Sequence, residues 1–236
     1  MKKTILLLGI ISLCIQCRML GPADFAVTPI PTKIDLPRLE ILTHQQSFGA
    51  MFGNALWGNQ FLMYDNSWST FMPVGYQRSI APRKILDAMG YLERETAAIS
   101  RRTGNAHGYA RYKLLYYEVR QPGFGWEILS SLTCFIPNFF GMPFNRLRTD
   151  LELQLEIVDA QGNILSTYRS AQSALVWSAP YWGYWWTDAV RKACISALQM
   201  AMTDIKGQIA LDRNTLETQL LDGGQLPPFV SEGYRR

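Results

Sequence analysis

The chain has 236 residues, of which 12% are aromatic and 18% are charged. This length suffices for one well-buried domain, and the aromatic content argues against a disordered chain. The net charge of +4 arises from 23 Lys and Arg residues against 19 acids. Such a balance gives no support to nucleic-acid binding, which requires clustered cations.

The first residues resemble a bacterial lipoprotein signal. Lys2 and Lys3 precede an apolar run at residues 5–13 that is too short to span a membrane, and Cys17 follows. The three residues before Cys17 depart from the family pattern of Leu, a small residue and then Gly, Ala or Ser, but relaxed versions are found in the Bacteroidota. We therefore expect a signal peptide at residues 1–16 and acylation of Cys17, with plain secretion or a retained anchor as the alternatives.

Loss of the signal peptide and acylation of Cys17 leave two further cysteines, Cys134 and Cys194. In an oxidising compartment these two thiols can pair. Cys194 falls on the apolar stripe of a predicted helix, where a small buried thiol is the commoner arrangement. We therefore favour a buried thiol over a disulfide.

Four prolines predict that residues 17–37 form an extended tether between the lipid and the domain. The globular domain is predicted at residues 38–222 and begins with a strand at residues 38–46. Aromatic residues are frequent at residues 47–76, but glycines interrupt every period. We expect only a helix near residues 48–56 and a strand near residues 60–65 in this stretch.

The pattern becomes clearer at Pro82, which suits a first helical turn. Apolar residues then mark one face of an amphipathic helix that ends at Arg101 and Arg102. Aromatic and β-branched residues at 107–120 predict a central strand.

Residues 124–144 are mostly apolar, with Glu127 as their only charge. Pro137 and Pro143 break any helix long enough to span a membrane. Two interpretations remain, a shallow patch at the membrane interface beside the lipid anchor and a buried crossover into the next strand. We favour the buried crossover, because most apolar runs in globular chains belong to the core.

The clearest pattern of the chain is a hairpin followed by a long helix. Leucine or isoleucine at 151, 153, 155 and 157 alternates with polar residues, Glu152 and Glu156 among them, on a face expected to be solvated. Residues 159–163 form the turn, and residues 164–177 return. An apolar stripe then recurs at helical spacing, while Lys206 and other polar residues fall elsewhere; the stripe comprises Val190, Cys194, Ala197, Ala201, Ile205 and Ile209.

These elements predict an α+β fold, a single domain in which two long amphipathic helices cover a mostly antiparallel sheet. A short helical piece is expected at residues 214–221, and a loose tail at residues 223–236.

Aromatic residues are densest between the hairpin and the long helix. Rings with one polar edge are used both by cores and by binding surfaces, and we favour the core for most of them. Because so short a turn cannot point every ring the same way, we expect the set to divide. The candidate partner-binding residues are Tyr181, Trp182, Tyr184, Trp185 and Trp186.

The sequence carries no recognisable catalytic motif. His44 and His107 are 63 positions apart and lack a set of ligands at metal-binding spacing, and the glycine-rich nucleotide loops and the nucleophile elbow are missing. We therefore predict no catalytic residue, no metal and no cofactor.

Several short motifs resemble a group of uncharacterised bacterial envelope lipoproteins of Bacteroidota type. They are Ser131-Leu132-Thr133, the passage from Ile136-Pro137-Asn138 to Gly141-Met142-Pro143, the hairpin that ends in Tyr168, Tyr181-Trp182-Gly183-Tyr184, and Ala197-Leu198 with Ala201-Met202 and Ile205. The resemblance covers about a third of the chain. It implies a compact α/β domain, loosely like TolB amino-terminal and curli-secretion lipoproteins, and brings no catalytic residues.

Together these observations predict a lipid-anchored, non-enzymatic protein of the cell envelope, at the outer membrane rather than the inner. We expect it to bind another envelope component through its sheet edge or aromatic turn. The alternatives are a subunit of an oligomeric secretion or transport assembly and an envelope hydrolase with scattered catalytic residues. A deep pocket with converging carboxylates would favour the hydrolase.

Overall fold

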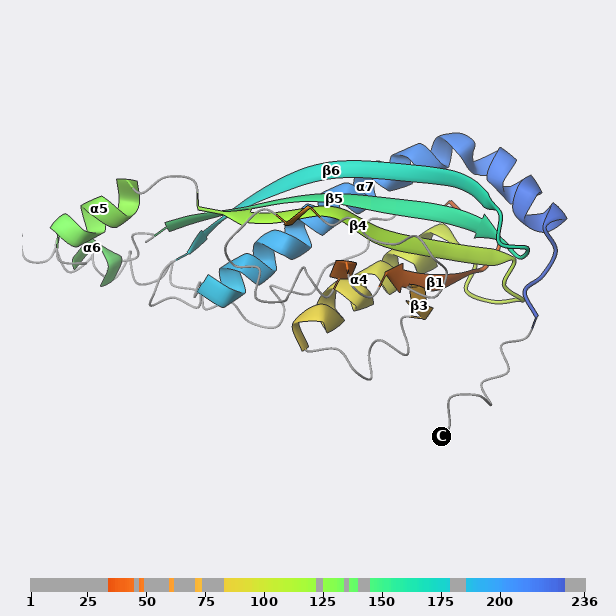
Figure 1. Cartoon of the computed structure of the whole chain (residues 1–236), viewed down its shortest axis with the longest axis horizontal. Coiled ribbons are helices and arrows are strands. Elements are labelled where there is room, and N and C mark those ends of the chain that lie inside the picture. Colours follow the sequence, from red (N-terminus) through yellow and green to blue (C-terminus); the bar gives the residue numbers. More distant parts are fainter. Residues whose placement is uncertain are drawn as a thin grey trace, which may run out of the picture.

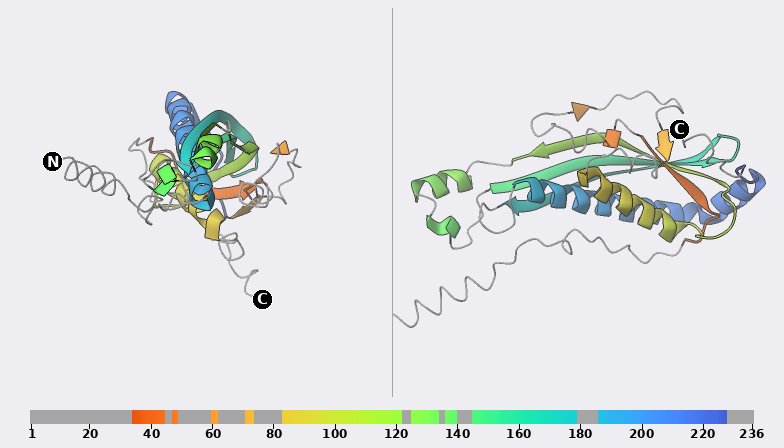
Figure 2. Two further views of the ribbon diagram at one scale, coloured as in Figure 1. Left: turned by 90° about the vertical axis from the view of Figure 1, so that its left-hand side faces the viewer. Right: turned by 90° about the horizontal axis from the view of Figure 1, so that it is seen from below.

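The computed structural model describes residues 34–44, 47–48, 60–61, 71–73, 83–121, 125–133, 136–139, 145–178 and 186–227. In these residues, two helices pack on one face of a single sheet, as the sequence predicted (Figures 1 and 2). The predicted helix at residues 48–56 lies largely outside this part of the chain.

The sheet contains six strands, in the order β3-β1-β4-β5-β6, with β2 also paired to β4. The strands are β1 (Leu39–His44), β2 (Gln60–Phe61), β3 (Phe71–Pro73), β4 (Gly108–Arg120), β5 (Asn145–Asp159) and β6 (Ile164–Ser178). Every pairing is antiparallel except that of β1 with β4. That parallel pairing requires a crossover, and helix α4 (Arg83–Ile99) lies within it.

The hairpin of β5 and β6 forms as predicted. The side chains of Leu151, Leu153, Leu155 and Ile157 are all buried, because their alternation directs them to the face that the helices cover. The Asp159 carboxylate accepts hydrogen bonds from the backbone N–H groups of Gln161 and Asn163, at 2.9 and 2.8 Å. Gly162 adopts a φ of 94°, which its lack of a Cβ allows.

The opposite face of the hairpin is less solvated than the alternation predicted. Glu152 is half-buried, but Gln154 and Glu156 are buried. Glu156 lies 3.4 Å from the guanidinium of Arg111, which is buried as well, and accepts a hydrogen bond of 2.6 Å from Gln154. Desolvation lowers the pKa of Arg111, and the negative charge of Glu156 opposes this shift. The prediction of a fully solvated face was therefore wrong at these positions.

Helix α7 (Trp186–Asp222) is longer than predicted, since the piece expected at residues 214–221 continues the same helix. Cys194, Ala197, Ala201, Ile205 and Ile209 are fully buried, which confirms the stripe, and Val190 is partly buried against the same core. The free thiol of Cys194 lies 2.9 Å from the Tyr117 hydroxyl. Burial raises the pKa of Cys194 to about 11, so the thiol remains protonated at neutral pH.

A buried ion pair joins the two helices. Lys206 of α7 pairs with Glu95 of α4, and both side chains are almost inaccessible to solvent, so our placement of Lys206 away from the packed face was wrong. Burial and the nearby charge of Glu95 raise the pKa of Tyr91 above its usual range. In the same region the hydroxyls of Thr96 and Tyr112 lie 2.7 Å apart. These polar side chains lie at the interface between α4, α7 and the sheet.

The packed domain begins earlier than the sequence suggested. Ile34 and Leu36, which we assigned to the tether, are buried, and the Leu36 N–H donates to the Ile99 carbonyl at 3.0 Å. At the other terminus, the Leu226 N–H donates to the Ala106 carbonyl at 2.7 Å, so the predicted tail is held at its start.

Removing one member of the buried pair should destabilise the protein strongly. Either Lys206→Met or Glu95→Leu leaves an unpaired charge in the core, and each should lower the free energy of unfolding by about 3–5 kcal/mol. The double variant removes both charges and should return close to the wild-type value. Urea denaturation of the three variants measures this coupling, and additive losses in the double variant would contradict it.

Candidate functional site

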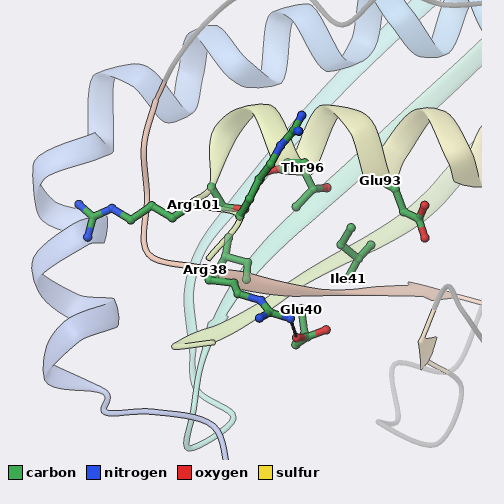
Figure 3. Close-up of a pocket in the computed structure, with 10 residues that line it drawn as sticks. Arg38, Glu40, Ile41, Glu93, Thr96 and Arg101 are labelled. Carbon is green, nitrogen blue, oxygen red and sulfur yellow. Dashed lines mark hydrogen bonds and ion pairs between the residues drawn. The ribbon is translucent and has the colours of Figure 1, made fainter. Parts of the chain in front are cut away.

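An open cleft of about 300 Å³ lies between β1 and the C-terminal half of α4 (Figure 3). Charged side chains dominate its lining, with Arg38 and Glu40 on the side of β1 and Glu93, Arg101 and Arg102 on the side of α4. The cleft is the hollow in which a catalytic site would be sought first.

The charges that line this cleft are mostly engaged with one another or with neighbouring elements. Arg38 binds Glu40 at 2.9 Å and the Gly104 carbonyl at 3.0 Å. Arg101 points away from the cleft and binds Glu217 of α7 at 2.8 Å (Figure 3). These guanidinium groups therefore tie β1, α4 and α7 together at the end of the sheet.

The two carboxylates of the cleft come from opposite walls, and in the view of Figure 3 Ile41 stands between Glu40 and Glu93. An acid and base pair would need its carboxylates to converge on one point. Among the described residues, moreover, no group of three His, Cys, Asp or Glu side chains is placed to hold a metal ion. The cleft therefore gives the hydrolase alternative no support.

The outer edge of β6 is a second candidate. β6 is the last strand in the sheet order, and in the described part of the chain no strand pairs with its outer side. The Arg169 carbonyl accepts a hydrogen bond of 3.1 Å from Gln208 of α7 instead of from a strand. Since N–H and C=O groups alternate in direction along a strand, we infer that Ser173 and Leu175 also direct theirs to the outer edge.

This edge lacks the usual protection against pairing with another chain. Natural edge strands carry charges, prolines or bulges that prevent strand addition. Residues 172–178 of β6 contain neither a charge nor a proline. Leu175 is 52% exposed and Trp177 is 38% exposed, so apolar side chains accompany the open backbone groups.

A third candidate is the segment between β4 and β5. It contains the helices α5 (Gly125–Leu132) and α6 (Ile136–Phe139), which project beyond the end of the sheet (Figure 1). Exposed apolar side chains gather here, namely Ile128, Leu129, Leu132 and Ile136. The prediction of a buried crossover was therefore wrong for these residues. Among the described helices, none is long and apolar enough to cross a bilayer.

The predicted aromatic site lies largely outside the described residues, as does Cys17. Tyr181, Trp182, Tyr184 and Trp185 fall between the end of β6 and the start of α7, while Trp186 begins α7 with a side chain that is not described. Trp177, near the end of β6, precedes this turn, and its ring lies 4.4 Å from the Arg146 guanidinium. The sequence analysis missed this pair, although strand alternation places both residues on the outward face.

Comparison with known proteins adds little. No family model and no curated protein matches the chain. A crystal structure from Caulobacter crescentus CB15, described provisionally as that of a lipoprotein, is 17% identical over 60% of this chain and 86% of its own, with a TM-score of 0.32. A likeness this weak carries no argument, so the resemblance to TolB amino-terminal and curli-secretion lipoproteins stays a prediction.

Alanine substitutions should divide the aromatic turn into two groups. Rings that belong to the core should cost roughly 3–5 kcal/mol each when truncated, while rings on the surface should cost little. We expect Trp182→Ala or Trp185→Ala to leave the melting temperature almost unchanged while at least one other truncation lowers it strongly. Thermal denaturation of all five variants measures this, and uniformly large losses would remove the turn as a binding surface.

Proposed function

We propose that this chain is a non-enzymatic lipoprotein of the cell envelope that binds another envelope component through the outer edge of β6. Cys17 carries the lipid, residues 18–33 give the domain its reach, and the outer membrane is favoured over the inner. The partner adds a strand to the sheet, with the aromatic turn beside it as a further contact.

The observation that carries this proposal is the unprotected edge of β6. Strand addition obtains affinity from main-chain hydrogen bonds and specificity from alternate side chains. The stretch around Ser173 supplies both, because its outward backbone groups are accompanied by the exposed side chains of Leu175 and Trp177. A long, uncharged edge of this kind invites pairing or aggregation unless another chain covers it.

The rest of the described surface supports binding more than catalysis. The cleft beside β1 has carboxylates on opposite walls, and Glu40 is already paired with Arg38. An oligomeric assembly would use the same edge if the added strand came from a second copy of the chain. Crosslinking from this edge distinguishes a second copy from a different envelope protein.

The lipid anchor can be tested by metabolic labelling. Cells grown with labelled palmitate should label the wild-type protein and not Cys17→Ala, because every acyl chain of the anchor is attached to this cysteine. Cys14→Ala serves as the matched control and should keep the label. Label that persists in Cys17→Ala and disappears in Cys14→Ala would move the anchor to Cys14.

The edge can be tested with a photo-crosslinking amino acid in place of Leu175 in living cells. Leu211, 88% exposed on α7, is the matched control position. We expect a crosslinked product from position 175 and none from position 211. Adding Ser173→Pro should abolish the product, because proline removes an outward N–H without breaking the ladder to β5. Ser173→Ala should retain it.

The mass of the crosslinked product distinguishes the occupants. A product containing one other envelope protein supports the proposed function, and a product of twice the chain's mass assigns the edge to a second copy. Equal products from positions 175 and 211, or none from either, would contradict a role for the β6 edge.

A further inference from the structure

Helices α5 and α6 lie in the connection between two adjacent strands, β4 and β5. β4 ends at Arg120 and β5 begins at Asn145, and these ends lie side by side in the sheet because Arg120 pairs with Arg148. The helices project from this end, clear of α4 and α7, in Figure 1 and in the right view of Figure 2. We call α5 and α6 the apolar tip.

Among the described side chains of the apolar tip, two polar ones are buried and four aliphatic ones are exposed, which departs from the pattern of a water-soluble helix pair. Ser130 and Asn138 are fully buried, whereas Leu132 is 77% exposed and Ile136 is 59% exposed. A helix packed on a domain in water normally turns its apolar stripe inward and its polar residues outward. Polar side chains inside and apolar side chains outside are the arrangement expected where the surroundings are hydrocarbon.

A tryptophan and an arginine stand at the base of the apolar tip. Trp177 and Arg146 are directly opposite each other on β6 and β5, and the guanidinium stacks on the ring. Neighbouring Arg120 and Arg148 are paired with Glu118 and Asp150. Arg146 has no carboxylate partner among the described residues, and its Nε has no hydrogen-bond acceptor there. An aromatic ring with a cation beside it is the composition of a membrane-interface belt.

We propose that the apolar tip inserts into the interface of an anionic bilayer, with Arg146 at the level of the lipid phosphates. The four exposed aliphatic side chains enter the boundary between headgroups and acyl chains. Trp177 lies at the level of the headgroups and limits how deep the tip inserts. This inference rests on the proposed lipid anchor, since the anchor keeps the domain beside a membrane. Insertion of the apolar tip supplies the second attachment that stable membrane binding requires.

A bilayer fits these observations better than a second protein. A protein interface normally offers hydrogen-bonding groups at its rim, and the described exposed side chains of the tip are chiefly aliphatic, with Ser131 and the neighbouring half-exposed Thr133 as the described polar ones. The charge of Arg146, which has no carboxylate partner among the described residues, is complementary to an anionic headgroup.

The depth of the apolar tip can be measured directly. The protein is isolated from cell membranes with whatever N-terminal modification it carries and reconstituted into phosphatidylcholine vesicles with or without phosphatidylglycerol. An environment-sensitive fluorophore is attached to Leu132→Cys in a Cys134→Ser background, where Cys194 is inaccessible. The matched control is Ile164→Cys, 53% exposed at the hairpin end of the sheet.

We expect the label at position 132 to shift to shorter wavelength and to be quenched by nitroxide-bearing lipids, while the label at position 164 does neither. Arg146→Gln should lower the ratio of inserted to non-inserted protein about fivefold on anionic vesicles, and this ratio should stay the same on neutral vesicles. Replacing Ile128 and Leu129 by serine should lower this ratio at least about tenfold on both.

A label at position 132 that stays in water on both vesicle types overturns the inference, even if Cys17 proves to be acylated. A second outcome also overturns it: the label shifts to shorter wavelength without quenching by nitroxide-bearing lipids, and the protein has twice the monomer mass. A second copy of the chain would then cover the tip. If Cys17 proves not to be acylated, the label is attached in a Cys17→Ser background, and quenching at position 132 there supports insertion of the tip and counts against the anchor alone.

Discussion

The arrangement of both helices depends on the buried contact between Lys206 and Glu95. Opposite charges taken out of water must meet closely, because each alone would cost several kcal/mol. The pair therefore fixes how far α4 can slide along α7, whereas an interface of aliphatic side chains alone tolerates small shifts. Small residues such as Ala197 and Ala201 bring α7 close to the strands, and the fixed helices keep β1 beside β4.

The helices cover one face of the sheet, and the two surfaces that we propose for contact lie at its margins. The charges of the cleft beside β1 are used to hold the elements of the domain together. By contrast, the outer edge of β6 has no described strand paired with it and carries the exposed Leu175, and the apolar tip exposes aliphatic side chains. Trp177 lies where these two surfaces meet, so a partner strand and a membrane would contact neighbouring parts of the molecule.

The sequence predicted those features that follow from local period. Alternation located the hairpin, and helical spacing located most of the stripe on α7. It failed where position depends on distant segments: Lys206 looked solvent-facing because its partner Glu95 lies 111 positions away, and Glu156 looked solvated because Arg111 comes from another strand. The exposure of Leu132 was missed for a different reason, since composition alone does not say whether an apolar run is covered. Cys17 and all five aromatic candidates remain predictions.

The parallel pairing of β1 with β4 has a consequence for the geometry of attachment. Leu39 pairs with Gly108, which lies opposite Asp159, so the chain joins the domain at the hairpin end and not at the end that bears the apolar tip. The fifteen residues of β5 span about 50 Å, and residues 18–33 span roughly the same when extended. If Cys17 carries the lipid, as we propose, an extended tether of this length would just reach along the sheet, and a deletion within residues 18–33 would pull the hairpin end of the domain toward the bilayer.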